Sequence, residues 1–482
     1  MPQFGGKHAV VIGGSIAGLL AGRILAEHFD YVTILERDQL PDDGGARKGA
    51  PQGLHSHIML KAGELVIAKW FPDFYEELNA SGEVPVIDSA DINWFHYGVW
   101  RLRVRTGMPK TLMTRPYFEW KIREKLVNQP NVTIRQQCEV AGLIVDESGN
   151  RVTGVKIGQK GKGKMTAAER HSSDVDPDAM EHLSADLVVD ASGRGSQTPN
   201  WLEAIGFPKP EEAAVKIDIG YSTRLYEPPK HKTFDWQFLL VYPKAPYGSK
   251  IGFVQAIEHN RWIVTLAGCV GDYPPNDEDG FLEYAKQLDR PDVYEAIKDA
   301  KPLTPIKIHR FPASLRRRYE KLSRFPDGLL VVGDAVSSFN PVYGQGMSVT
   351  AMGVNALDEC LQEQAMYNKG NLAGLHRRYF RKVAKIVDAA WLAAVTEDFR
   401  YPQAQGPKPF GTKLLNWYMG KLFELASVDQ KIYFQVILVQ NLVASPRTLF
   451  SPYIIRQVLK SNFTKTAEKE NKSIAVEMNK QA

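Results

Sequence analysis

The sequence predicts an α/β protein with a parallel sheet, a second β-rich domain and a helical C-terminal segment. Residues 8–35 alternate strand, glycine turn, helix and strand. A second apolar strand at 328–332 ends in Gly333-Asp334 and leads into a helix from Gly346. Residues 215–271 contain several alternating, strand-like stretches. Strand-helix-strand order indicates a parallel sheet, whereas alternation without helices indicates an antiparallel one.

Composition excludes several classes of protein. The chain has 482 residues, of which 44% are apolar and 24% charged, so it can bury a large core. A net charge of +5 without a dense basic tract argues against a nucleic-acid-binding protein. The three cysteines are isolated, we expect no secretory leader, and no apolar run is long enough to span a membrane. We therefore expect a reduced, cytoplasmic protein, and peripheral membrane contact stays open.

The first element predicts a dinucleotide site. A strand at 8–12 precedes a turn at 13–15, a helix at 16–29 and a strand at 31–35. The turn and helix start read Gly13, Gly14, Ser15, Ile16, Ala17 and Gly18, a GxGxxG pattern with serine at its second glycine. The helix N-terminus offers free N–H groups to a pyrophosphate. Glu36, with Arg37 after it, ends the second strand, where a carboxylate can accept hydrogen bonds from a ribose. An ordinary glycine turn is the alternative.

The next segment, residues 47–57, is a polar loop with two histidines. Arg47 and Lys48 are candidates to approach the phosphates. His55 and His57 have the i, i+2 spacing of two ligands on a strand, but no third ligand accompanies them, so we expect no metal. A helix is predicted over about 116–128, with Thr114 as its cap.

The middle of the chain predicts short strands at 132–134, 139–146, 151–157 and 185–192. We interpret the polar stretch 158–184 as a surface excursion. The basic cluster at Arg316, Arg317 and Arg318 is interpreted as a solvated helix face, or as a patch that steers an anion.

The second glycine-rich motif follows the strand at 328–332. Asp334 at the end of this strand can hold the hydroxyls of a sugar or ribityl chain. The loop from Asn340 to Gly346 then opens a helix, whose N-terminus stabilises negative charge on a ring edge.

The two motifs together resemble the glutathione-reductase-type FAD-binding fold of flavin-dependent aromatic hydroxylases, over about residues 7–365. The resemblance implies that Asp334, after Gly333, binds the ribityl chain. It places Pro341, Gly344, Gly346 and Met347 along the isoalloxazine edge. It also implies that Arg115 contacts the cofactor and that the backbone of Val140 meets the adenine. The stretch Asp190-Ala191-Ser192-Gly193 departs from the Asp-Gly motif that those hydroxylases tie to NAD(P)H.

A narrower resemblance is carried by residues 47–57, 186–196, 261–265 and 333–348. These segments are similar to those of the polyene epoxidases of polyether-ionophore biosynthesis, the lasalocid and monensin type. The resemblance implies an FAD-dependent monooxygenase of secondary metabolism. Through a C4a-hydroperoxyflavin it would insert one atom of O2 into a hydrophobic alkene or an electron-rich ring. The electron donor would be NAD(P)H, used directly or through a separate flavin reductase.

Two alternatives stay open: a flavin-dependent reductase or dehydrogenase of a lipid-like alkene, and a non-catalytic flavin- or lipid-binding module. No catalytic residue is assigned, because the flavin carries the chemistry. Aromatic residues within 94–100, 234–253 and 391–434 suggest a large apolar pocket. The predicted FAD domain comprises 1–90, 110–200 and 325–370. The predicted substrate domain comprises 91–109 and 201–324. A helical region at 371–463 and a flexible tail at 464–482 complete the prediction.

Overall fold

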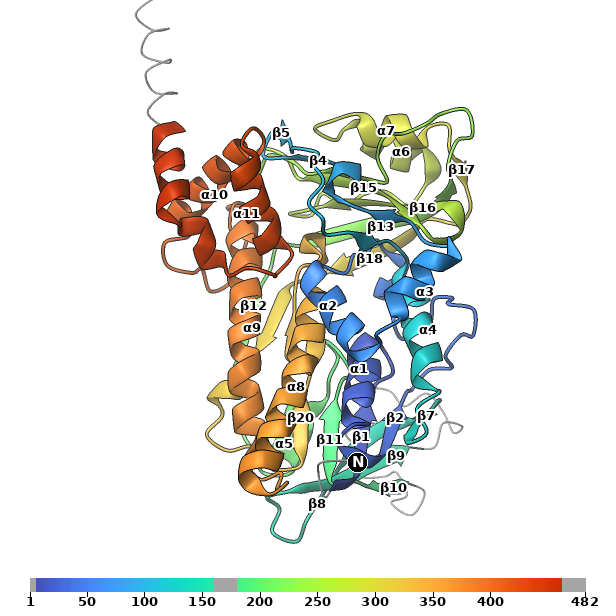
Figure 1. Ribbon diagram of the computed structural model, residues 1–482, viewed down its shortest axis with the longest axis vertical. Helices are drawn as coiled ribbons and strands as arrows, with labels where there is room; N and C mark the ends of the chain where they lie inside the picture. The colour runs from blue at the N-terminus through green and yellow to red at the C-terminus, as the bar shows by residue number, and fades with distance from the viewer. Residues whose placement is uncertain (1–5, 159–179, 462–482) are drawn as a thin grey trace, which may run out of the picture.

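A five-stranded parallel sheet lies at the centre of the lower half of the molecule in Figure 1, a computed structural model that describes residues 6–158 and 180–461. Its order is β20-β11-β1-β2-β7. The strands are β1 (Gly6–Ile12), β2 (Phe29–Leu35), β7 (Val132–Arg135), β11 (Leu187–Asp190) and β20 (Leu329–Val331). Val11 pairs with Ile34 on one side and with Val189 on the other. These strands are apolar runs because both faces of the sheet are covered.

Helices cover one face of this sheet. They are α1 (Ile16–Leu25), α4 (Arg115–Leu126) and α8 (Gly346–Asn368). α1 is buried along most of its length, and Gly22 lets it approach Ile34 of β2 closely. The predicted helix to residue 29 was too long: α1 ends at Leu25, because Phe29 already pairs with Gly6 in the sheet.

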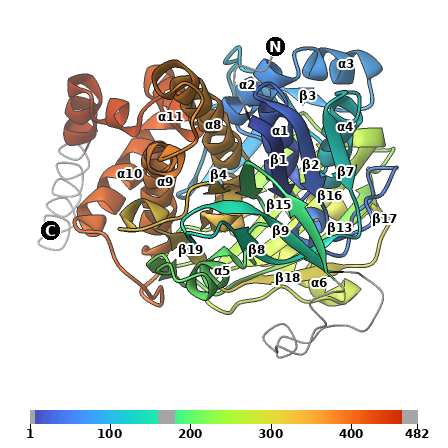
Figure 2. The same ribbon diagram turned by 90° about the horizontal axis from the view of Figure 1, so that it is seen from below.

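An antiparallel sheet packs on the side of the parallel sheet away from α1 (Figure 2). Its strands are β8 (Glu139–Val145), β9 (Val152–Gly158) and β10 (Glu181–Ser184), in the order β10-β9-β8. The interpretation of 158–184 as a surface excursion was wrong at both ends. Gly158 ends β9, and Glu181–Ser184 pairs with β9. Residues 159–179 lie outside the described residues.

A larger, mostly antiparallel sheet forms the upper half of the molecule (Figure 1). Its order is β17-β13-β16-β15-β14-β4-β5, with β18 also paired to β13. The strands are β4 (Ile92–His96), β5 (Val99–Trp100), β13 (Ile219–Glu227), β14 (Phe238–Val241), β15 (Lys250–Ile257), β16 (Arg261–Gly268), β17 (Lys301–Pro302) and β18 (Lys307–Phe311). Helices α6 (Glu278–Lys286) and α7 (Asp292–Ile297) pack on its outer face around Phe281 and Val293. The inner face is left for the site.

Smaller elements connect the two halves. They are α2 (Lys61–Trp70), α3 (Phe74–Ser81), α5 (Thr198–Ala204), the pair β3 (Val86–Ile87) and β6 (Lys110–Thr111), and the sheet of β12 (Glu212–Val215), β19 (Ser314–Arg317) and β21 (Ser337–Ser338).

The arginine cluster lies mainly on strand β19, so its interpretation as a solvated helix face was wrong. Arg316 is 1% exposed and lies 3.1 Å from a Glu320 oxygen, with Asp388 as its second partner. Arg317 donates to Glu212 at 2.8 Å and to the Ala335 carbonyl at 3.1 Å. Both guanidinium groups are therefore buried, and each has acidic partners that compensate for its loss of hydration.

The C-terminal region is helical. It comprises α9 (Leu375–Asp398), α10 (Thr412–Ala426) and α11 (Gln430–Gln440), followed by a short 3-10 turn (Pro446–Phe450) and a helix at 452–461. α9 runs beside α8, and α10 and α11 sit at its upper end, next to β4 and β5 (Figure 1). Across the described ranges 6–158 and 180–461, no helix has the length and apolarity to cross a bilayer. The predicted tail at 464–482 lies outside these ranges, and the division into domains stays a prediction.

Candidate functional site

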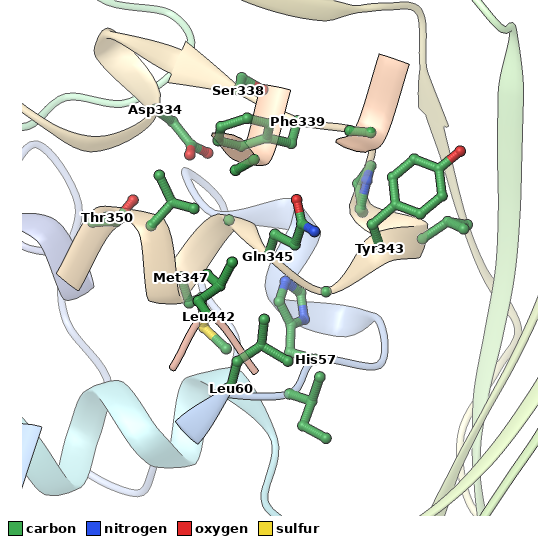
Figure 3. A pocket seen from close by; sticks show the side chains of 18 of the residues that line it. His57, Leu60, Asp334, Ser338, Phe339, Tyr343, Gln345, Met347, Thr350 and Leu442 are labelled. Carbon is green, nitrogen blue, oxygen red and sulfur yellow. The ribbon is translucent and has the colours of Figure 1, made fainter. Parts of the chain in front are cut away.

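One continuous cavity of about 1070 Å³ extends from the start of α1 to the C-terminal helices. Its first end is lined by the α1 turn and by the segment that joins β20 to α8. Its other end is lined by the inner face of the large sheet and by α9, α10 and α11. Figure 3 shows the first end, where Asp334, Gln345 and Met347 surround the same space as Leu442 from the C-terminal region.

The turn before α1 requires glycine for steric reasons. Gly13 has φ +106, and a Cβ on it would lie 2.7 Å from the Ala191 carbonyl oxygen. A Cβ on Gly18 would lie 1.8 Å from the carbonyl oxygen of Gly13. The bare backbone of this turn therefore faces the cavity at the N-terminus of a buried helix, an arrangement suited to an anion.

Glu36 is buried beside this turn and is already hydrogen-bonded. Its carboxylate accepts the Gly14 N–H at 2.7 Å and the Asp38 N–H at 2.9 Å. Arg47 lies 2.7 Å from Glu36 and 3.3 Å from Asp38, and it also donates to the Ser15 hydroxyl. Arg47 therefore lies beside the helix start with its charge paired to two carboxylates, and its role as a phosphate-binding residue stays a prediction.

The sequence analysis missed Glu119, which faces the same helix start. Its carboxylate accepts the Ile16 N–H at 3.2 Å and the Arg115 Nε–H at 2.9 Å. The signal was present, because Arg115 and Glu119 stand four residues apart on α4, the spacing of a helical ion pair. Glu119 holds Arg115 against the cavity wall and gives one free N–H of α1 a partner.

Asp334 projects into the cavity from a short turn (Gly333–Ala335) after β20. Among the described residues its carboxylate has no hydrogen-bond or ion-pair partner. Burial raises the pKa of Asp334, and the charges of Arg115 and Arg194 counter this only in part. An unpartnered carboxylate facing a cavity fits a ligand that brings hydroxyl donors, such as the ribityl chain of FAD.

The loop between Pro341 and Gly346 leaves a bare surface at the start of α8. A short turn (Pro341–Tyr343) is ended by Gly344 in the left-handed region, φ +63. A Cβ on Gly346 would meet no atom within 4 Å, so the helix start faces open space. The buried Oε1 of Gln345 lacks a partner in the described part of the chain. A flat ring with N–H donors and an electron-rich edge fits this surface.

The structure gathers most of the predicted site residues around this one cavity. Fourteen of them line it: Gly13, Ser15, Ile16, Ala17, Glu36, Arg37, Arg47, Arg115, Val140, Asp334, Pro341, Gly344, Gly346 and Met347. Gly18 and Gly333 lie behind the wall, where they allow close packing. Their joint placement is a finding, whereas their roles toward a cofactor stay predictions.

The two histidines of the 47–57 segment line the cavity as neutral side chains. His55 Nδ1 lies 2.7 Å from the Thr223 hydroxyl, and His57 Nδ1 lies 2.8 Å from the His55 carbonyl oxygen. Burial, with the nearby charge of His309, lowers the pKa of His55 to about 3. Burial, with the charge of Arg115, lowers the pKa of His57 to about 4. Within the described ranges no three His, Cys, Asp or Glu side chains are grouped as metal ligands.

The far end of the cavity is an aromatic chamber, defined here by Trp94, His96, Tyr242, Phe253 and Phe423. The ring centroids of Trp94 and Tyr242 are 6.0 Å apart, and those of Tyr242 and Phe253 are 5.3 Å apart. The Tyr242 hydroxyl donates to the Val342 carbonyl at 2.8 Å. This bond connects the chamber directly to the loop before α8.

Comparison with known proteins identifies a relative. No family model matches the chain. Protein Rv3254 of Mycobacterium tuberculosis (strain ATCC 25618 / H37Rv) is 32% identical over 404 residues, which are 82% of this chain and 81% of that protein. The chain belongs to the family of Protein Rv3254. At this identity and coverage, the fold described here extends to that family.

Several solved structures share the architecture of this Rv3254-family chain. The flavin-dependent brominase Bmp2 aligns with a TM-score of 0.64 at 14% identity, covering 95% of this chain and all of Bmp2. A flavoprotein/dehydrogenase from Cytophaga hutchinsonii aligns with a TM-score of 0.64 at 12% identity, covering 96% and 99%. A mutant form of 2-methyl-3-hydroxypyridine-5-carboxylic acid oxygenase aligns with a TM-score of 0.57 at 18% identity, covering 80% and 90%. The predicted α/β, Rossmann-like fold is thereby confirmed, whereas binding of FAD by this chain stays a prediction.

Proposed function

We propose that this protein is an FAD-dependent monooxygenase that acts on a hydrophobic substrate. The observation that carries the proposal is the single cavity in which the predicted FAD residues and the aromatic chamber meet. A bound flavin would then have its ring edge at the loop before α8, and a substrate in the chamber would face it. Structural neighbours that include an oxygenase and a brominase support flavin-dependent oxidative chemistry.

The residues of the first end would bind the cofactor. The N-terminus of α1 with Arg47 and Arg115 would hold the pyrophosphate, Glu36 the adenosine ribose, and Asp334 the ribityl hydroxyls. When bound, FAD supplies electron transfer and oxygen activation. The start of α8 at Gly346 would stabilise negative charge on the ring edge, because a helix N-terminus carries partial positive charge.

The residues of the chamber would orient the substrate and exclude water. Aromatic side chains from β4, from the residue that follows β14, from β15 and from α10 form its walls. Such walls bind an extended apolar or conjugated molecule by contact area and by ring stacking. This chemistry supports the finer proposal of alkene epoxidation or ring hydroxylation, as the resemblance to polyene epoxidases implies. NAD(P)H, direct or through a reductase, would be the electron donor.

The first experiment is a visible absorption spectrum of the purified protein after incubation with FAD and gel filtration. We expect bound flavin, and bleaching of its bands by anaerobic NADPH or NADH if reduction is direct. Bands that the nucleotides leave unchanged would assign reduction to a separate reductase or to the substrate-bound state. Failure to retain any FAD would contradict the proposal.

Isotopic labelling separates the proposal from its alternatives. A monooxygenase incorporates one atom of 18O2 into its product, whereas a reductase or dehydrogenase incorporates none. Assays with added bromide test for brominase activity, since a brominase would give a product that contains bromine. A protein that binds FAD but never consumes NAD(P)H with a polyene extract would favour a non-catalytic module.

A further inference from the structure

A buried arginine lines the aromatic chamber. Arg101 follows β5 and is 8% exposed. Its guanidinium carbon lies 3.4 Å from the centroid of the Trp94 ring and 4.7 Å from that of Phe423. Nη1 donates to Gln440 Oε1 at 2.7 Å, and Nη2 lies 3.4 Å from His96 Nδ1. Two of its five N–H groups are thereby engaged, and the others remain for a ligand.

No carboxylate in the described part of the chain forms an ion pair with Arg101, although the charge of Glu397 acts on it from a distance and partly opposes the effect of burial on its pKa. The nearest candidate that lines the cavity, Glu397, is taken by other partners. It lies 2.8 Å from Arg400 Nε and accepts the Tyr97 hydroxyl at 2.6 Å. The remaining acidic side chains of the lining are Glu36, Glu139 and Asp334, and Glu36 and Asp334 were assigned to the cofactor end.

The other titratable groups around Arg101 add no negative charge. Burial, with the charges of Arg101 and Arg400, lowers the pKa of His96 far below its ordinary value, so the ring is neutral. Burial raises the pKa values of Tyr97, Tyr242 and Tyr433, which therefore stay protonated. Lys385 and Lys110 also line the cavity, and they are cations rather than partners.

Arg101 itself keeps its charge. Burial lowers its pKa to about 10, which still leaves it protonated at neutral pH. An arginine that is buried without a directly paired carboxylate is costly, since the charge loses much of its hydration. Stacking on Trp94 and Phe423 offsets part of that cost. A planar guanidinium with free N–H groups also matches a carboxylate in a two-point arrangement.

We propose that Arg101 binds the carboxylate of the substrate, so that this protein acts on an apolar molecule with one terminal acid group. The apolar body would lie along Trp94 and Tyr242 toward the loop before α8, the path marked by the Tyr242–Val342 hydrogen bond. This inference deepens the proposed function. It rests on the proposed function in one respect, that the bound molecule is a substrate. The anion site itself rests only on Arg101 and its surroundings.

The test compares an acid with its neutral ester. The probes are cis-parinaric acid, a conjugated C18 polyene carboxylate whose fluorescence rises in apolar cavities, and its methyl ester. Binding is measured on oxidised, FAD-loaded protein with no reductant. We expect the acid to bind about 10- to 100-fold more tightly than the ester, the range for a charge-assisted hydrogen-bonded pair. Arg101→Gln should abolish this preference by weakening the acid alone.

The matched control is Arg290→Gln. Arg290 also stacks on an aromatic ring, with its guanidinium carbon 5.6 Å from the Trp100 centroid, but it lies outside the cavity lining. It should leave both affinities unchanged. Arg101→Lys keeps the charge without the planar fork and should retain an intermediate preference. If Arg101→Gln does not fold, the acid preference of Arg101→Lys tests the anion site in its place.

Equal affinities of acid and ester for the wild type would overturn the anion site, and so would no binding of the acid. An Arg101→Gln variant that keeps the full acid preference would also overturn it. The visible flavin spectrum of the same sample keeps the two proposals apart. FAD-loaded protein without acid preference refutes the anion site alone. Protein that fails to retain FAD refutes the proposed function, and the same titration on apoprotein still tests Arg101.

Discussion

Replacement of Asp334 by asparagine should have opposite effects on the apoprotein and on FAD binding. The carboxylate is half-buried in the cavity wall and has no partner in the described chain, and its partial burial raises its pKa. The folded apoprotein therefore holds this proton to higher pH than the unfolded chain does. Stability is lost as pH rises from the ordinary aspartate value, about 4, through the raised pKa. Asparagine has no charge to bury, so Asp334→Asn should be the more stable apoprotein at pH 7.

FAD reverses this order, because its ribityl hydroxyls would give the carboxylate its missing partners. One charge-assisted hydrogen bond contributes about 1.5–3 kcal/mol. Its loss should weaken FAD binding about 10- to 150-fold. The surface variant Asp235→Asn, whose side chain pairs with Arg103 and lies outside the cavity lining, should change neither quantity.

Two measurements check the prediction. Urea unfolding of the apoproteins at pH 4 and pH 7 should show a stability difference that appears only at the higher pH. Flavin fluorescence quenching gives the FAD dissociation constants. An Asp334→Asn apoprotein less stable than the wild type at pH 7 would refute the account of an unpartnered carboxylate. An unchanged FAD affinity would refute the ribityl assignment.

Two further variants test the loop before α8 and the loop after β5. Gly346→Leu should leave the melting temperature of the apoprotein nearly unchanged, because a Cβ there meets no atom within 4 Å. The same variant should fail to retain FAD. A variant with a full flavin spectrum would contradict the predicted ring site. Asp88→Asn should lower the free energy of unfolding by about 1–2 kcal/mol at pH 7, since Asp88 accepts the Thr106 N–H at 2.7 Å and the Gly107 N–H at 2.9 Å. Burial alone would raise the pKa of Asp88, but these hydrogen bonds hold it below its ordinary value, so its stabilisation is present above about pH 4 and is lost as pH falls through the lowered pKa. Urea titrations at pH 7 and pH 2.5 check this, and a difference that grows in acid would be inconsistent with it.

The sequence predicted the part of the fold that depends on local order. One strand-helix-strand unit contains Gly13, Gly18 and Glu36. Within it, residue type and spacing predict the turn, the helix start and the end of the second strand. The segment at 328–346 is equally local. We predicted that this segment lies beside the first unit only from the resemblance to a known fold, because neither segment by itself indicates that β20 and β1 belong to one sheet.

The sequence failed where pairing is long-range. Arg316 and Arg317 read as a surface cluster, because their partners Asp388 and Glu212 stand 72 and 105 residues away. Arg101 gave no signal either, since its neighbours come from β4, α10 and α11, which meet only in the folded protein. Charge alone does not distinguish a solvated arginine from a buried one. The distinction lies in partners that three-dimensional structure supplies.

The two ends of the cavity are synthesised at different times during translation. Most of its cofactor end is built from segments between residues 12 and 350, with Leu442 as a later addition, whereas its far wall includes Leu415, Phe423 and Leu449. Translation therefore supplies most of the first end about one hundred residues before the last wall of the chamber. During that interval the aromatic side chains of β4 and β14 lie uncovered by their C-terminal helices. The chamber gains its last wall only after α10 and α11 have been made.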